Sequence, residues 1–181
     1  MWQTKAVKCK YNKFDYRLNI LSLDEIIADN ILGPTYEYWR LQCRGRPYPQ
    51  RSDITPRGLK PLLRHAVLVA VLDGGADYEY RVIGDACVQA HGCNLQGLRW
   101  SELDICNSGY ATEIRKIYDC AAQMGQPCAA SCIIPRRFFT APYSDDFVHC
   151  TFLCLPLGQP DSGINYVLIA SHYSYDEACL P

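Results

Sequence analysis

The sequence predicts a single α+β domain with a five-stranded antiparallel sheet, helices on one face of the sheet and a helical extension at the N-terminus. Two strand-like runs, residues 65–72 and 78–83, are separated by a short glycine-containing turn, the pattern of a hairpin. Short helical segments and a longer amphipathic helix at residues 110–124 follow. Three more strand-like runs complete the order, at residues 128–134, 147–155 and 164–172.

Two helices are expected before the sheet. Ser22 and Glu25 have the spacing of a capping box, which predicts a helix from residue 22 to about residue 30. The Gly33-Pro34 pair is expected to end it, and a second helix is expected over residues 35–43, ended by Gly45 and Pro47. These helices are candidates to cover one face of the sheet.

The prolines of residues 46–64 exclude a long element, so short turns are expected there, including one helical turn at Thr55. The strand that follows is apolar on both faces and needs cover on both sides. One face has Val67, Val69 and Val71, and the other has Leu68, Ala70 and Leu72.

After Gly84 the pattern becomes helical. Asp85 is expected to cap a short helix that Gly92 ends, and Ser101 to cap the next one. The longer helix has an apolar stripe at helical spacing. The stripe consists of Ala111, Ile114, Ile117, Tyr118, Ala121 and Met124.

Charge and composition exclude several classes of protein. The 181 residues include 18 Lys and Arg against 19 Asp and Glu, so no strong net charge attracts nucleic acid or an anionic membrane. No segment is apolar over the length of a membrane span, and a soluble, cytoplasmic protein is expected. The 11 cysteines are an odd number in a chain that can build a core without disulfides, so reduced thiols are expected.

A basic segment lies between residues 40 and 64, where Asp53 is the one acidic residue. We interpret it as a structural connector held by pairs of arginine and carboxylate. The alternative is a site for a phosphorylated or acidic partner. The basic residues are Arg40, Arg44, Arg46, Arg51, Arg57, Lys60 and Arg64.

Two blocks of sequence resemble a stand-alone PAS-like family of alphaproteobacteria, over about residues 35–170. The first block is Tyr38-Trp39-Arg40-Leu41, Arg44-Gly45-Arg46-Pro47, Pro49, Arg51, Asp53, Ile54 and Pro56. The second is Tyr80-Arg81-Val82-Ile83-Gly84 with Leu95-Gln96-Gly97. The resemblance implies a PAS-like sheet and a sensory or protein-interaction role, with no established catalytic residues. Family members usually have a second glycine at the position of Cys43 or Arg44 and fewer cysteines.

The expected domain organisation has four parts. Residues 1–21 form an N-terminal segment, and residues 22–64 form the N-terminal helices and the Pro/Arg-rich connector. Residues 65–173 form the PAS-like core, and residues 174–181 form a C-terminal tail.

Cysteine and histidine residues raise the question of metal or thiol chemistry. Cys87 and His91 would share one face of a helix, with Cys93 close by, so a zinc site or a reactive thiol is an alternative function. The pairs Cys128/Cys132 and Cys150/Cys154 lie in strands, where four residues span roughly 13 Å, so neither pair is expected to share a metal. These four are interpreted as small buried side chains.

A small, largely apolar ligand is expected between the sheet and the middle helices. The strand at 78–83 places Tyr78, Tyr80 and Val82 on one face and Glu79, Arg81 and Ile83 on the other, and the sequence does not settle which face is inside. The predicted ligand-binding residues are Tyr80, Ile83, His91, Trp100, Tyr118 and Phe152.

The most favoured function is a non-catalytic sensory module that binds a small ligand, a protein partner or both, with no nucleic acid and no membrane as partner. A homodimer is expected through the aromatic helix, with Tyr36, Tyr38, Trp39 and Leu41 as partner-binding residues. Two alternatives remain open: the metal- or thiol-dependent enzyme or redox sensor with Cys87, His91 and Cys93, and a ligand-free interaction scaffold. No catalytic residue, metal ligand or cofactor is assigned.

Overall fold

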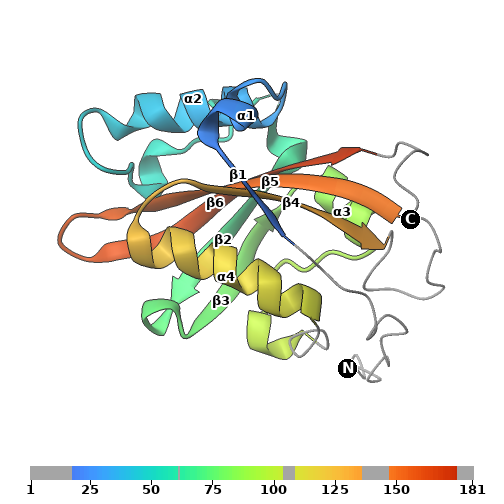
Figure 1. Cartoon of the computed structure of the whole chain (residues 1–181). Helices are drawn as coiled ribbons and strands as arrows, with labels where there is room; N and C mark the ends of the chain where they lie inside the picture. Colours follow the sequence, from blue (N-terminus) through green and yellow to red (C-terminus); the bar gives the residue numbers. More distant parts are fainter. Residues whose placement is uncertain (1–17, 61, 104–108, 136–146, 175–181) are drawn as a thin grey trace.

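A computed structural model describes residues 18–60, 62–103, 109–135 and 147–174, and its centre is one antiparallel sheet (Figure 1). Its six strands lie in the order β1-β4-β5-β6-β2-β3. Five of the strands are those expected, and the sixth, β1, was missed because it has only three residues and precedes the first helix. The strands are β1 (Asn19–Leu21), β2 (Ala66–Leu72), β3 (Asp77–Ile83), β4 (Cys128–Pro135), β5 (Phe147–Gln159) and β6 (Gly163–Ser174).

The first helix, α1 (Leu23–Ile27), begins at the predicted capping box. The Ser22 hydroxyl oxygen accepts from the Glu25 amide, and the Glu25 carboxylate accepts from the Ser22 amide at 2.8 Å. The helix ends three residues earlier than expected, because Asp29 starts the next one by accepting from the amides of Ile31 and Leu32.

The second helix, α2 (Leu32–Cys43), includes the Gly33-Pro34 pair, so the expectation that this pair separates the helices is wrong. Proline is tolerated in the first turn because its missing amide hydrogen has no helical partner there. Glycine is needed because a Cβ at Gly33 would lie 2.5 Å from the carbonyl oxygen of Ile27. The pair therefore brings the start of α2 against the end of α1.

Helices cover the sheet on both faces (Figure 1). On the inner face, α3 (Asp85–His91) and α4 (Gly109–Met124) pack over a core that includes Val67 and Val69. On the outer face, α1 and α2 pack over a second core that includes Leu68. This confirms the prediction that the apolar strand at residues 66–72 is covered on both sides.

The connector between α2 and β2 consists of short turns, as expected. It contains the 3-10 helices η1 (Arg51–Asp53) and η2 (Leu62–His65). Arg46 binds Asp53 at 2.6 Å and also donates to the backbone carbonyls of Gln42 and Cys43. The bond from Arg46 lowers the pKa of the Asp53 carboxyl. These contacts favour the structural interpretation of the basic segment.

A β-bulge in β3 changes which residues face inward. The register against β2 shifts between Leu68, which lies opposite Val82, and Val69, which lies opposite Tyr80. Arg81 is therefore an extra residue, and the alternation is interrupted there. Ile83 consequently lies on the inner side with Tyr80, whereas the regular pattern placed them on opposite faces, and Val82 is 41% exposed.

The helix ends after β3 differ from expectation by one or two residues. Gly84, not Asp85, precedes α3, and Gly92 ends α3 with φ 82° as predicted. Ser101 lies inside the 3-10 helix η4 (Trp100–Glu102), where its hydroxyl donates to Asp77. On α4, the stripe from Ile114 to Ala121 is buried as expected, but Met124 is 64% exposed because the helix ends at the edge of the core. The side chain of Ala111 lies outside the described residues.

Candidate functional site

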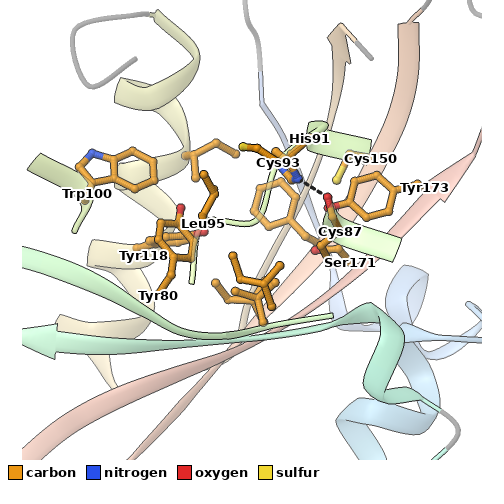
Figure 2. A pocket seen from close by; sticks show the side chains of 15 residues that line it. Tyr80, Cys87, His91, Cys93, Leu95, Trp100, Tyr118, Cys150, Ser171 and Tyr173 are labelled. Carbon is orange, nitrogen blue, oxygen red and sulfur yellow. Dashed lines mark hydrogen bonds between the residues drawn. The ribbon is translucent and has the colours of Figure 1, made fainter. Parts of the chain in front are cut away.

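A cavity of about 50 Å³ lies between the inner face of the sheet and the helices α3, η4 and α4 (Figure 2). Strands β2, β3, β5 and β6 form its floor, because their inward side chains meet there. The structure brings all six residues of the predicted ligand site together around it: Tyr80, Ile83, His91, Trp100, Tyr118 and Phe152.

One end of the cavity is aromatic (Figure 2). The rings of Tyr80 and Trp100 are stacked with centroids 6.5 Å apart, and Tyr118 meets Trp100 edge to face at 5.5 Å. All three side chains are buried, and burial raises the pKa of the Tyr80 hydroxyl. This end offers flat apolar walls to a ligand.

The other end contains polar groups and sulfur atoms: Cys87, His91, Cys93, Cys150, Ser171 and Tyr173 (Figure 2). The Nδ1 hydrogen of His91 is donated to the Cys87 carbonyl oxygen at 2.8 Å, because a carbonyl oxygen can only accept. Burial lowers the pKa of His91, so the neutral ring is favoured at neutral pH, with its second nitrogen as an acceptor. The His91 ring also meets Tyr173 edge to face at 6.0 Å.

The thiols at this end are not activated. Burial raises the pKa of both Cys87 and Cys93 to about 11, so each keeps its proton at neutral pH. The Cys87 thiol points to the carbonyl of His65 at 3.7 Å. In the described ranges no three His, Cys, Asp or Glu side chains converge as metal ligands. The geometry therefore offers no support for a nucleophile or a zinc site at Cys87, His91 and Cys93.

The cysteines of β4 and β5 pair across the strands. Cys128 lies opposite Cys154, and Cys132 lies opposite Cys150. Within each strand the two cysteines are separated as expected, but the cross-strand pairs were missed. The sequence contains a signal for these pairs: each of the two strands has cysteines at positions i and i+4, and antiparallel neighbours with the same spacing can align both cysteines.

The residues predicted to bind a partner lie on α2 in different environments. Trp39 is 4% exposed and its indole nitrogen donates to the Pro156 carbonyl at 2.9 Å, so this side chain packs on the protein's own sheet. Tyr36 stacks on Trp39, and the hydroxyl of Tyr38 accepts from the Thr55 amide. Leu41 is 64% exposed. Of the four, Leu41 presents the most accessible apolar surface.

Comparison with protein families identifies the class. A family described as PAS domain matches residues 32–168, which is most of the chain, and the protein belongs to this family of sensory and signalling domains. This agrees with the observed sheet, flanked by helices over a small internal cavity. No curated protein matches the sequence.

Among solved structures, an RNA-binding Light-Oxygen-Voltage receptor aligns with a TM-score of 0.44 and 15% sequence identity. The alignment covers 68% of this chain and 36% of that one, so the protein spans about a third of the length of the receptor that it matches. Within the described ranges, no helix has both the length and the apolar character needed to cross a bilayer.

Proposed function

We propose that this protein is a non-catalytic sensory module that binds a small, largely apolar molecule in the cavity between the sheet and α3 and α4. The observation that carries this proposal is the cavity itself, with an aromatic end at Trp100 and a polar end at His91. A ligand with a flat apolar part and one hydrogen-bonding group matches this arrangement.

The size of the cavity constrains how such a ligand binds. Its volume of about 50 Å³ is a third of the roughly 150 Å³ that accepts benzene in an engineered protein core. By proportion it holds about two heavy atoms, which at ~1.5 kcal/mol each correspond to binding no tighter than the millimolar range. A signalling ligand must therefore widen the cavity, and the displacement of its walls is the conformational change that a sensor requires.

The experiment is a titration of ¹⁵N-labelled protein with indole, followed by amide chemical shifts. Shifts are expected on the inner face, at the residues of α4, β5 and β6 that surround the cavity. Ile169→Phe adds volume to the cavity wall and should abolish them, whereas Leu168→Ile conserves volume on the outer face and should not.

The unliganded Ile169→Phe spectrum must remain dispersed, which shows that the variant folds. No shifts in the wild type at the solubility limit of indole, or equal shifts in Ile169→Phe, would contradict the proposal. Native mass spectrometry of the purified protein adds a direct search for a retained small molecule.

A homodimer formed through the N-terminal elements is the second candidate. It is favoured by exposed apolar side chains there, namely Ile20 at 70%, Ile27 at 51% and Leu41 at 64%. Light scattering should give the mass of a dimer for the wild type and of a monomer for Leu41→Glu. A wild-type monomer across micromolar concentrations would remove this candidate.

A further inference from the structure

Helix α4 leads through a short turn into β4 (Figure 1). Two half-buried cysteines meet at this turn. The sulfur of Cys120, in the last turn of α4, lies 2.7 Å from the sulfur of Cys128, the first residue of β4. We propose that Cys120 and Cys128 form a redox-active dithiol, which a small disulfide such as oxidised glutathione converts into an intramolecular disulfide bond.

The distance between the sulfurs supports this proposal. They need to approach by about 0.7 Å to reach the ~2.05 Å of a disulfide bond. The turn between them contains Gly125, whose φ of 64° is in the region that favours glycine, and no other element separates the two side chains.

Solvent exposure distinguishes Cys120 and Cys128 from the cross-strand pair Cys132 and Cys150. Cys120 and Cys128 are both half-buried, and the Cys120 thiol also lies 3.8 Å from the sulfur of the exposed Met124. Cys132 and Cys150, opposite one another on β4 and β5, are 3% and 5% exposed. A dissolved disulfide can therefore approach the first pair without opening the core.

The reaction is two successive thiol–disulfide exchanges. The Cys120 thiolate attacks one sulfur of the small disulfide, forms a mixed disulfide and releases one small thiolate. The Cys128 sulfur, on losing its proton to solvent, attacks the Cys120 sulfur, forms the internal disulfide and releases the second small thiolate. Two protein thiols are oxidised, and one small disulfide is reduced to two thiols.

The order of the two steps follows from the environments of the two sulfurs. Burial, together with the adjacent Cys120 sulfur, raises the pKa of the Cys128 thiol to about 12. Cys128 therefore keeps its proton at neutral pH, and we assign the first attack to Cys120 because its sulfur lies beside the exposed Met124, where a dissolved disulfide can approach. The second step, closure by Cys128, is intramolecular, and the proximity of the two sulfurs favours it.

The sequence allows a direct test on the full protein. The protein is incubated with oxidised glutathione, free thiols are alkylated, and trypsin digestion without reductant is followed by mass spectrometry. Trypsin releases residues 117–136 as one peptide with three cysteines: Cys120, Cys128 and Cys132. If the internal bond forms, this peptide has one alkyl group, at Cys132, and its mass is two hydrogens lower than that of the same singly alkylated peptide with two free thiols. A Cys132–Cys150 bond would instead link this peptide to the peptide of residues 138–181.

Matched variants control the test. Cys120→Ser should give a peptide in which the two remaining cysteines are alkylated, whereas Cys128→Ser, which lacks the sulfur that closes the bond, should keep glutathione on Cys120 and an alkyl group on Cys132. Cys43→Ser, which changes a thiol on the outer face, should form the same internal bond as the wild type. Oxidation should also raise the melting temperature of the wild type, reversibly on adding a reductant, but not that of Cys120→Ser.

Two results would overturn the proposal. The first is three alkylated cysteines in this peptide in a sample where glutathione adducts elsewhere show that the oxidant reacted. The second is a stable glutathione adduct at Cys120 without the internal bond. Neither result depends on whether a ligand binds in the cavity.

Discussion

Replacing Trp39 tests whether α2 is an integral part of the domain or a helix held ready for a partner. Trp39 is 4% exposed, and a buried tryptophan removes about 200 Å² from water, worth at most ~5 kcal/mol at 25 cal/mol per Å². We expect Trp39→Ala to lower the free energy of unfolding by about 3–5 kcal/mol. Trp39→Phe should cost about 2 kcal/mol, of which roughly 1 kcal/mol comes from leaving the Pro156 carbonyl without its donor.

The assay is urea unfolding followed by far-UV circular dichroism. Leu41→Ala is the matched control, because Leu41 is on the same helix but 64% exposed and should change stability by less than ~0.5 kcal/mol. We propose that residues 22–64 and 65–173 form one folding unit, so every variant should unfold in a single transition. Equal, small effects of Trp39→Ala and Leu41→Ala would refute the packing argument.

Two further changes test the connector and the start of α3. Because Arg46 lowers the pKa of Asp53, the stability this pair provides is present above pH ~4 and is lost as the pH falls through the lowered pKa. Asp53→Asn should therefore cost about 1 kcal/mol at pH 7 and progressively less below pH 4, and a pH-independent difference in urea unfolding would contradict this. A Cβ at Gly84 would lie 2.3 Å from the backbone oxygen of Arg64, so Gly84→Ala should cost about 1–3 kcal/mol, and an unchanged melting temperature would show that the backbone yields freely.

Five of the six strands in the described residues, and six of the residues that line the cavity, were predictable because their signals are local. A strand of seven apolar residues must be covered on both faces of the sheet. The hairpin that contains Tyr80 is indicated by the alternating side chains of residues 78–83 and by the turn before them. The alternation failed at Ile83, because the extra residue at Arg81 is fixed by pairing with β2, which is a contact between strands and not a property of either one.

The features that the sequence did not predict depend on contacts between residues that lie in different elements. The aromatic character of α2 indicated an apolar surface, but nothing near Trp39 in the sequence reveals that Pro156 accepts from its indole nitrogen. The pairing of Cys120 with Cys128 depends on how the end of α4 turns into β4, so no spacing pattern within one element indicates it.

The inner and outer cores pack on opposite faces of the same strands. A displacement of a strand on one face therefore acts on the core of the other face. In β5, Phe152 belongs to the inner core, while Leu153 and Leu155 belong to the outer core beneath α1 and α2. Because protein interiors pack as densely as organic crystals, a molecule that pushes β5 outward at Phe152 would press Leu153 and Leu155 against α1 and α2. The outer helices must then shift or lose contact, which gives events in the cavity a route to the far surface of the protein.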